Sequence, residues 1–170
     1  MIGGAMKLYS GMINEIKNRE MKLFRRRKRK RLYNKNFTVL ASDCNGTFIY
    51  HDMGIPFLSP TINLTIGMND FVKMLENLEW YIQQDIVELK GDYKYPTGNL
   101  GGGIRINFVH YKSFDEGVLK WKERKERINW DNLFIVGSEK NGCTYETIQR
   151  FERLPYENKV IFTHVDYPEF

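Results

Sequence analysis

The run LFIVG, residues 133–137, constrains the fold more than any other stretch of the sequence. Consecutive apolar residues leave no polar face, which is typical of a strand buried on both sides in a parallel sheet. Helical periods flank this run at residues 114–128, where Trp121 belongs to the apolar stripe, and at residues 144–154, where Thr144 is the expected N-cap. The pattern therefore predicts an α/β fold.

Further elements follow from the same patterns. Strands are predicted at residues 37–42, 104–111 and 159–164, and a helix at 69–82 with Asn69 as its N-cap. We expect all four strands to share one mostly parallel sheet that helices cover in a Rossmann-like, three-layer arrangement. Right-handed crossovers would be formed by the helices at 114–128 and 144–154.

The glycines at 101–103 precede a predicted strand. Phosphate-binding glycine loops instead follow a strand and open a helix, so that backbone amides and the helix N-terminus meet the phosphate. A hairpin or a bulge is therefore the prediction for these glycines.

The basic charge is confined to the N-terminus. Residues 1–35 hold 12 Lys or Arg and 2 Glu, and the remainder holds 14 basic and 19 acidic residues. Apolar residues at roughly helical spacing precede the run RRRKRKR, residues 25–31, so a basic helical arm is predicted. Residues 7–31 of such an arm can lie on an anionic membrane surface or bind polyanions without sequence preference. The alternatives are an arm packed by its apolar stripe on the core or on a second subunit, and a nuclear localisation signal.

Length and composition set further limits. With 170 residues and 42% hydrophobic content, the chain is expected to be a single α/β domain, residues 36–170, behind the arm, residues 1–35. No apolar stretch approaches the ~20 residues that cross a bilayer, and the start lacks a signal peptide's apolar centre. A cytoplasmic protein is expected, with possible peripheral attachment at the inner face of the membrane and no specific nucleic-acid partner.

The turn SDCNG, residues 42–46, is the candidate reaction centre. It leaves the carboxyl end of a predicted parallel strand, where open α/β sheets bind ligands. A helix start would lower the pKa of the Cys44 thiol, which would make Cys44 a candidate nucleophile. Its base would be His51, His110 or His164, and the sequence does not choose among them. The alternative is that Cys44 is a buried joint.

Other polar residues are candidates for binding. Phosphates of a donor would meet Asn45 and Gly46, or the KNGCT turn at 140–144, and Ser59 and Thr61 would either line the crevice or cap a turn fixed by Pro60. The turn Trp130–Asp131–Asn132 is predicted to be structural. Cys44 and Cys143 show no metal or redox spacing, so free thiols and no metal site are predicted. The sequence does not identify a cofactor.

The order of several blocks resembles the domain of unknown function 1919 family. The resemblance covers residues 37–168 and is carried by the cysteine turn, SPT at 59–61, YPTG at 95–98 and the block KWKERKERINWDN. The arm is not part of it. Two departures lie in the turn: Asp43 and Thr47 stand where relatives usually have asparagine and a second glycine. A carboxylate at Asp43 should disfavour a Cys44 thiolate. Relatives usually continue past YPEF, so a shortened C-terminal edge is also expected.

This family is met in bacterial exopolysaccharide and capsule biosynthesis loci. The resemblance therefore implies a surface-polysaccharide protein, and the predicted function is a glycosyl- or acyl-transferase that takes a nucleotide-sugar or acyl donor and a glycan acceptor. Asp43, Asn45, Gly46, Ser59 and Thr61 would bind substrate. The alternatives are a non-catalytic module that recruits pathway proteins or anionic membrane, and a thiol-dependent hydrolase that uses Cys44.

Overall fold

A computed structural model describes residues 2–140 and 142–170, with side chains from residue 11 onward. The chain divides into two compact units. The first comprises residues 1–35 and 49–56, and the second comprises residues 36–48 and 57–170. The division assigns residues 49–56 to the same unit as the basic arm.

The first unit is built on α1 (Ile2–Arg31), a helix of 30 residues that ends in the basic run. Arg25 Nε lies 2.9 Å from the Asp52 carboxylate. One turn further on, Arg29 donates to the carbonyl of Asp52 at 3.4 Å. The helical arm predicted from the sequence is thus confirmed as a helix. Among the described helices, none combines the length and the apolarity that crossing a membrane requires.

The second unit contains a parallel sheet of three strands, β1 (Thr38–Ala41), β6 (Leu133–Ser138) and β7 (Asn158–Phe162). Their order is β1-β6-β7, so β6 is central, as its unbroken apolar run predicts. Ala41 pairs with Val136, and Ser138 pairs with Phe162. Helix α6 (Tyr145–Glu152) joins β6 to β7 and begins at Thr144, whose side chain caps it as predicted.

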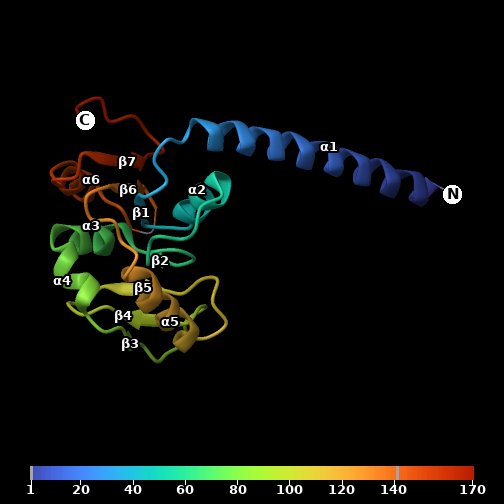
Figure 1. Cartoon of the computed structure of the whole chain (residues 1–170). Helices are drawn as coiled ribbons and strands as arrows, with labels where there is room; N and C mark the ends of the chain where they lie inside the picture. The colour runs from blue at the N-terminus through green and yellow to red at the C-terminus, as the bar shows by residue number, and fades with distance from the viewer. Residues whose placement is uncertain (1, 141) are drawn as a thin grey trace. The chain divides into compact units, whose positions relative to one another are not determined.

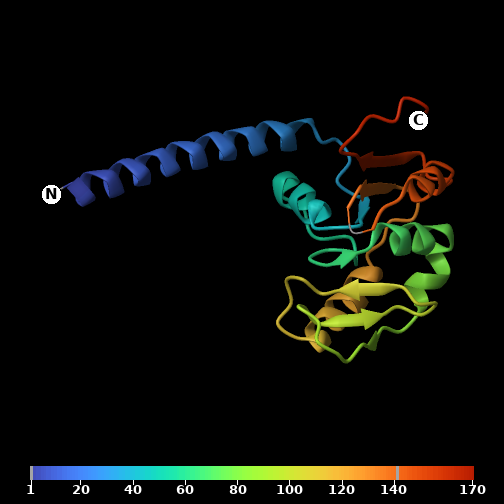
Figure 2. The ribbon, with the colours of Figure 1, turned by 180° about the vertical axis from the view of Figure 1, so that it is seen from behind.

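A separate antiparallel sheet has the order β2-β5-β4-β3. Its strands are β2 (Thr65–Ile66), β3 (Val87–Glu88), β4 (Thr97–Asn99) and β5 (Arg105–Asn107). Figures 1 and 2 show the two sheets as distinct groups of strands. The prediction that residues 104–111 belong to the parallel sheet is therefore wrong, and the structure is a mixed α/β fold with two sheets.

A glycine turn explains this difference. Gly101, Gly102 and Gly103 all have positive φ, between 52° and 84°. Residues that have a Cβ rarely adopt this backbone conformation. The turn folds β5 back on β4, and Leu100 N donates to Ile104 O at 2.8 Å. The predicted hairpin role of the glycines is confirmed.

Helices complete the second unit. The helix predicted at 69–82 is two helices, α3 (Met68–Glu76) and α4 (Leu78–Gln83), because Asn77 leaves the helical conformation at φ −143° and ψ 54°. Asn69 lies inside α3 and Gly67 is the N-cap position, so the predicted cap is wrong. Helix α5 (Phe114–Lys125) begins at Ser113, whose side chain accepts from the Glu116 amide. α5 links the two sheets and is not a crossover within one sheet.

The core lies between these elements. The apolar residues that recur at helical spacing in α3 and α4 are all buried, namely Phe71, Leu75, Leu78 and Ile82, and Trp121 is buried with them. Helix α2 (Asn45–Met53) follows β1 directly. A Cβ on Gly46 would lie 3.1 Å from the Ala41 Cβ, so the first turn of α2 packs tightly on β1.

Candidate functional site

The carboxyl ends of β1, β6 and β7 form one edge because the three strands are parallel. A residue with an ionisable side chain follows each strand: Cys44 after β1, Glu139 after β6 and His164 after β7. Cys44 and His164 therefore follow strands that end at the same edge, as the sequence predicts. β6 lies between their strands, which places β1 and β7 about 10 Å apart.

Glu139 and His164 form a pair at this edge. His164 Nδ1 lies 2.7 Å from Glu139 Oε2, and the His164 backbone amide donates to the same oxygen at 2.9 Å. The backbone of Glu139 is fixed in turn, because its amide donates to Phe162 O at 2.8 Å. The Glu139 side chain is 10% exposed and that of His164 is 73% exposed. The carboxylate is thus held inside while the imidazole reaches solvent.

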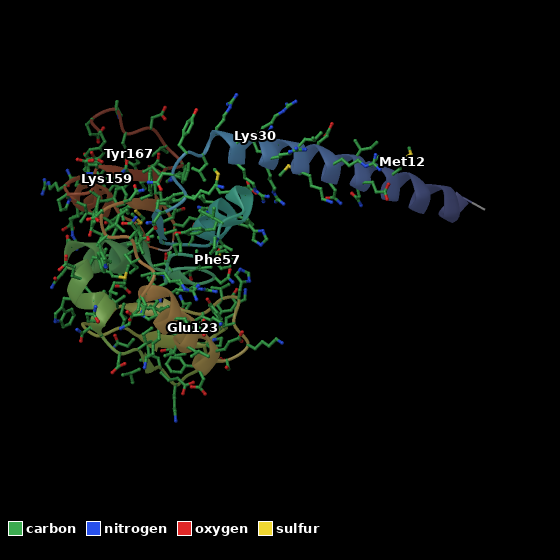
Figure 3. The ribbon with its side chains drawn as sticks, in the orientation of Figure 1. Met12, Lys30, Phe57, Glu123, Lys159 and Tyr167 are labelled. Atoms are coloured by element: carbon green, nitrogen blue, oxygen red, sulfur yellow. The ribbon has the colours of Figure 1, made fainter. Side chains whose placement is uncertain are left out.

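Tyr167 completes the pair from the segment after β7, where Figure 3 labels it. Its hydroxyl donates to Glu139 Oε1 at 2.6 Å. This hydrogen bond is the main cause that lowers the pKa of Glu139, with bonds from His164 adding to it, and it raises the pKa of Tyr167 to about 12. Glu139 is therefore held as a carboxylate that accepts from both neighbours.

The Cys44 turn is ordered by its own backbone and by Asp43. Asp43 Oδ1 accepts from the Asn45 amide at 2.9 Å, and the Cys44 carbonyl accepts from the Thr47 amide at 3.0 Å. Burial raises the pKa of the half-buried Cys44 thiol, and the Asp43 charge raises it further. The expected effect of Asp43 is confirmed, and the lowered thiol pKa expected from the helix start is not found. Neither His110 nor His164 has a hydrogen bond to Cys44 in the described part of the chain.

Thr47, in the first turn of α2, supports a neighbouring loop. Its hydroxyl lies 3.2 Å from both Asn63 Oδ1 and the Asn63 amide. Asn63 has a φ of 63°, a conformation that asparagine tolerates better than most residues. Thr47 therefore fixes a strained loop residue.

Arg124 and Tyr111 lie close to this loop. Arg124 is buried, and its Nη1 donates to the Tyr111 hydroxyl at 2.6 Å. Tyr111 donates in turn to Ile62 O at 2.8 Å. Burial raises the pKa of Tyr111, and the neighbouring Arg124 opposes that rise. The sequence analysis did not single out these residues.

The remaining histidines lie elsewhere. His110 is exposed, follows the antiparallel strand β5, and its amide donates to Asn63 O at 3.2 Å. The prediction that it follows a strand of the parallel sheet is wrong. His51 lies in the last turn of α2 and belongs to the first unit. Of His110 and His164, only His164 has a carboxylate partner within ion-pair distance among the described residues.

Ser59 and Thr61 are completely buried. Their hydroxyls lie 3.1 Å apart, and Thr61 Oγ1 accepts from the Ala41 amide at 3.0 Å. Thr61 thus accepts from a backbone amide on the unpaired edge of β1, and Ser59 contacts the Thr61 hydroxyl. Both hydroxyls therefore have partners within the protein. Asn45 and Gly46 remain predicted contacts for a donor phosphate. The alternative turn at 140–144 includes residue 141, which lies outside the described residues.

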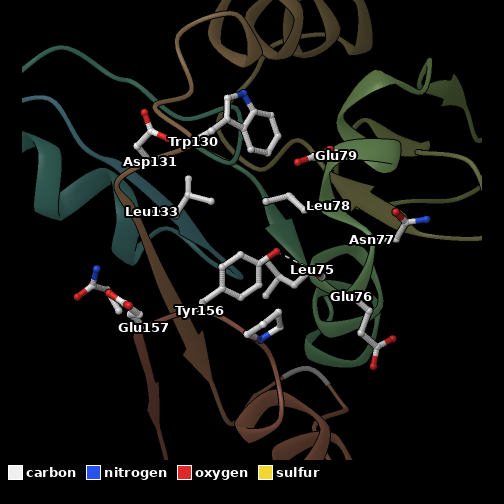
Figure 4. Close-up of a pocket in the computed structure, with 12 residues that line it drawn as sticks. Leu75, Glu76, Asn77, Leu78, Glu79, Trp130, Asp131, Leu133, Tyr156 and Glu157 are labelled. Atoms are coloured by element: carbon white, nitrogen blue, oxygen red, sulfur yellow. Dashed lines mark hydrogen bonds between the residues drawn. The ribbon is translucent and has the colours of Figure 1, made fainter.

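The amino ends of β6 and β7 border an open pocket of about 580 Å³ (Figure 4). Leu75, Leu78, Leu133 and Tyr156 contribute apolar surface, and Tyr156 donates to Leu75 O at 2.7 Å. Trp130 and Asp131 also line it. Asn132 Nδ2 donates to Asn36 O at 3.0 Å, so the predicted structural role is confirmed for Asn132. Because Leu133 and Glu139 stand at opposite ends of β6, the pocket and the Glu139–His164 pair are about 20 Å apart.

Within residues 2–140 and 142–170, no group of three or more His, Cys, Asp or Glu side chains could hold a metal ion. Cys44 and Cys143 are free thiols, as predicted. The negative charge of Glu139 contributes to a raised pKa of Cys143, after burial.

Comparison with known proteins gives the family. The model described as a domain of unknown function, DUF1919, matches residues 15–170. The chain belongs to this family. The DUF1919 match begins inside α1, so the prediction that the arm lies outside the family pattern is wrong for residues 15–35. A protein of Haemophilus influenzae strain Rd, described as uncharacterized, is 37% identical over 165 residues, which cover 97% of this chain and 80% of the relative.

Glu139 and Tyr167 are the site residues that sequence reasoning missed. One signal for Glu139 was present, because it comes directly after the most apolar strand of the chain. At such a position the ligand-binding edge of a parallel sheet is expected. Tyr167 carried no comparable signal, since its role depends on how the segment after β7 turns back toward Glu139.

Proposed function

We propose that the chain catalyses transfer of an acyl or glycosyl group to a hydroxyl of a surface-polysaccharide precursor. The observation that carries this proposal is the Glu139–His164 pair at the carboxyl edge of the parallel sheet. A histidine whose Nδ1–H is held by a carboxylate has its Nε2 free to act as a base. The choice of a polysaccharide acceptor rests on the resemblance to a family that is met in exopolysaccharide and capsule biosynthesis loci.

His164 would act on the acceptor. With Nδ1–H donated to Glu139, Nε2 accepts the proton of the attacking hydroxyl, and the hydroxyl oxygen bonds to the electrophilic carbon of the donor. The imidazolium that forms is stabilised by the Glu139 carboxylate at 2.7 Å. The bond to the leaving group breaks, and that group leaves with the electron pair. His164 then returns its proton to the leaving group, so the base is regenerated.

Tyr167 would be a positioning residue. Its hydrogen bond to Glu139 Oε1 leaves Oε2 to face His164. Since the bond also lowers the pKa of Glu139, the carboxylate stays charged at neutral pH.

Cys44 fits a nucleophilic role less well than His164 fits a basic one. The pKa of the thiol is raised by burial and by Asp43, and a thiolate is the form that attacks. A thiol-dependent hydrolase is for this reason the weaker proposal.

The test is a panel of donors with the purified full chain. The protein is incubated with oligosaccharide acceptors and either an acyl-CoA or one of a set of nucleotide sugars. The mass of the acceptor is then measured by mass spectrometry. The gain of an acyl or a sugar mass identifies the class of reaction. His164→Gln should lower the rate by about a hundredfold or more, whereas His110→Gln, at the exposed histidine, should retain it. Equal rates for wild type and His164→Gln would refute the proposed role.

A further inference from the structure

Helix α1 carries an exposed apolar face. Met12, Ile16 and Leu23 are 54%, 51% and 56% exposed. Their spacing of four and seven residues places them on one side of a helix, because each residue turns the helix by about 100°. Ile13 and Phe24 widen the same face and are also exposed.

The opposite side of α1 is the one that contacts its own unit. Arg25 pairs with Asp52 and Arg29 bonds to the Asp52 carbonyl. Ile16 and Arg25 are nine residues apart, which is about 900° of rotation and so half a turn in projection. The apolar face is thus directed away from the contact with residues 51–54.

The charge of α1 indicates what could cover this face. Eleven Lys or Arg and two Glu lie between residues 2 and 31, and seven of the bases are the consecutive residues 25–31. A second copy of the helix would bring two strongly positive segments together, which like-charge repulsion opposes. A nucleic acid would satisfy the bases and leave the apolar side chains in water. An anionic lipid surface satisfies both features.

We propose that α1 docks on an anionic membrane surface and lies in its plane. Met12, Ile16 and Leu23 would enter the boundary between head groups and acyl chains. The bases of the run 25–31 that make no contact within the unit would meet lipid phosphates, and their aliphatic stems would cover apolar surface. Figure 3 labels Met12 and Lys30 toward the two ends of this surface. This docking uses neither Glu139 nor His164 and is independent of the proposed transfer reaction.

The experiment is sedimentation of the full chain with vesicles of phosphatidylglycerol and phosphatidylethanolamine, against vesicles of phosphatidylcholine. The apolar-face variant Met12→Gln, Ile16→Gln, Leu23→Gln keeps residues that favour a helix. The charge variant Arg26→Gln, Arg27→Gln, Lys30→Gln removes bases that make no ion pair among the described residues. The matched control is Asn14→Gln, Asn18→Gln, on the polar side of the same helix. Circular dichroism verifies that all of them are helical.

Wild type and the asparagine control should bind the anionic vesicles and leave the phosphatidylcholine vesicles in solution. The charge variant should bind about a hundredfold more weakly, since each base near an anionic surface contributes roughly fivefold to affinity. The apolar-face variant should lose at least tenfold. Equal binding of wild type to both vesicle types would overturn the proposal. So would a wild-type dimer in analytical ultracentrifugation that the apolar-face variant abolishes while vesicle binding persists, because a second copy would then be the partner.

Discussion

Glu139 Oε2 and His164 Nδ1 lie 2.7 Å apart, one residue beyond β6 and two residues beyond β7. The distance follows from the pairing of these strands, because Ser138 is in register with Phe162. Two neighbouring strand ends thus supply the proposed base and the group proposed to orient it. Their sequence separation of 25 residues conceals this relationship until the register of the sheet is known.

The Tyr167–Glu139–His164 network should make stability depend on pH at both ends of the scale. Folding lowers the pKa of Glu139, so its contribution is present above the unfolded pKa of about 4.3 and is lost as pH falls through the folded value. Folding raises the pKa of Tyr167 from 10.0 to about 12, so that contribution is full below the unfolded value and is lost as pH rises through the folded one.

Urea unfolding of wild type and Glu139→Gln at a series of pH values measures this pH dependence of stability. Between about pH 6 and about pH 3, wild type should lose more unfolding free energy than the variant, which lacks the titrating carboxyl. Parallel curves for the two proteins over that range would contradict the network. Exposed Glu126→Gln, outside the network, is the matched control and should follow wild type.

Cys44 and Cys143 should both react slowly in the native state. Burial raises the pKa of each thiol. The charge of Asp43 raises the pKa of Cys44 further, and the charge of Glu139 raises the pKa of Cys143 further. In timed iodoacetamide labelling near neutral pH, read by peptide mass, both cysteines should react more slowly in the native protein than in the unfolded protein. Asp43→Asn should accelerate labelling of Cys44 and leave Cys143 unchanged. Labelling of native Cys44 faster than in unfolded protein would instead reveal an activated thiolate.

We expect the Thr61 hydroxyl to stabilise the fold and not to bind substrate. Thr61→Val keeps the shape of the side chain and removes the acceptor of the Ala41 amide, which leaves a buried donor unpaired. The expected loss is ~1–3 kcal/mol of unfolding free energy, measured in urea. Thr163→Val, at an exposed position, should change stability by less than about 0.5 kcal/mol. A neutral Thr61→Val variant would show that the buried bond is dispensable.

Local patterns predicted much of the parallel sheet and missed the second one. The continuous apolar run at 133–137 identified the central strand because burial on both faces permits no polar residue there. Residues 104–108 alternate instead: Ile104, Ile106 and Phe108 are buried, and Arg105 is exposed. That period of two indicates an antiparallel strand with one face near solvent. The glycine turn before it carried the same information.

The candidate site was predictable in place and not in composition. The strand pattern indicated that Cys44 and His164 follow parallel strands, and the structure places both after strands that end at the same edge of one sheet. That ligands bind at this edge stays a prediction. The carboxylate partner of His164 depends on strand register, and the environment of Cys44 depends on burial, which a single sequence does not display. Ser59 and Thr61 show the same limit, since their hydroxyls are used by the backbone of β1.

A double-mutant cycle on the rate of transfer tests the central claim most directly. With the donor identified by the panel, kcat is measured for wild type, Glu139→Gln, His164→Gln and the double variant. If Glu139 acts only by orienting His164, the double variant should be no slower than His164→Gln alone, about a hundredfold or more below wild type. A His164→Gln variant with wild-type kcat, or losses that multiply in the double variant, would contradict the account.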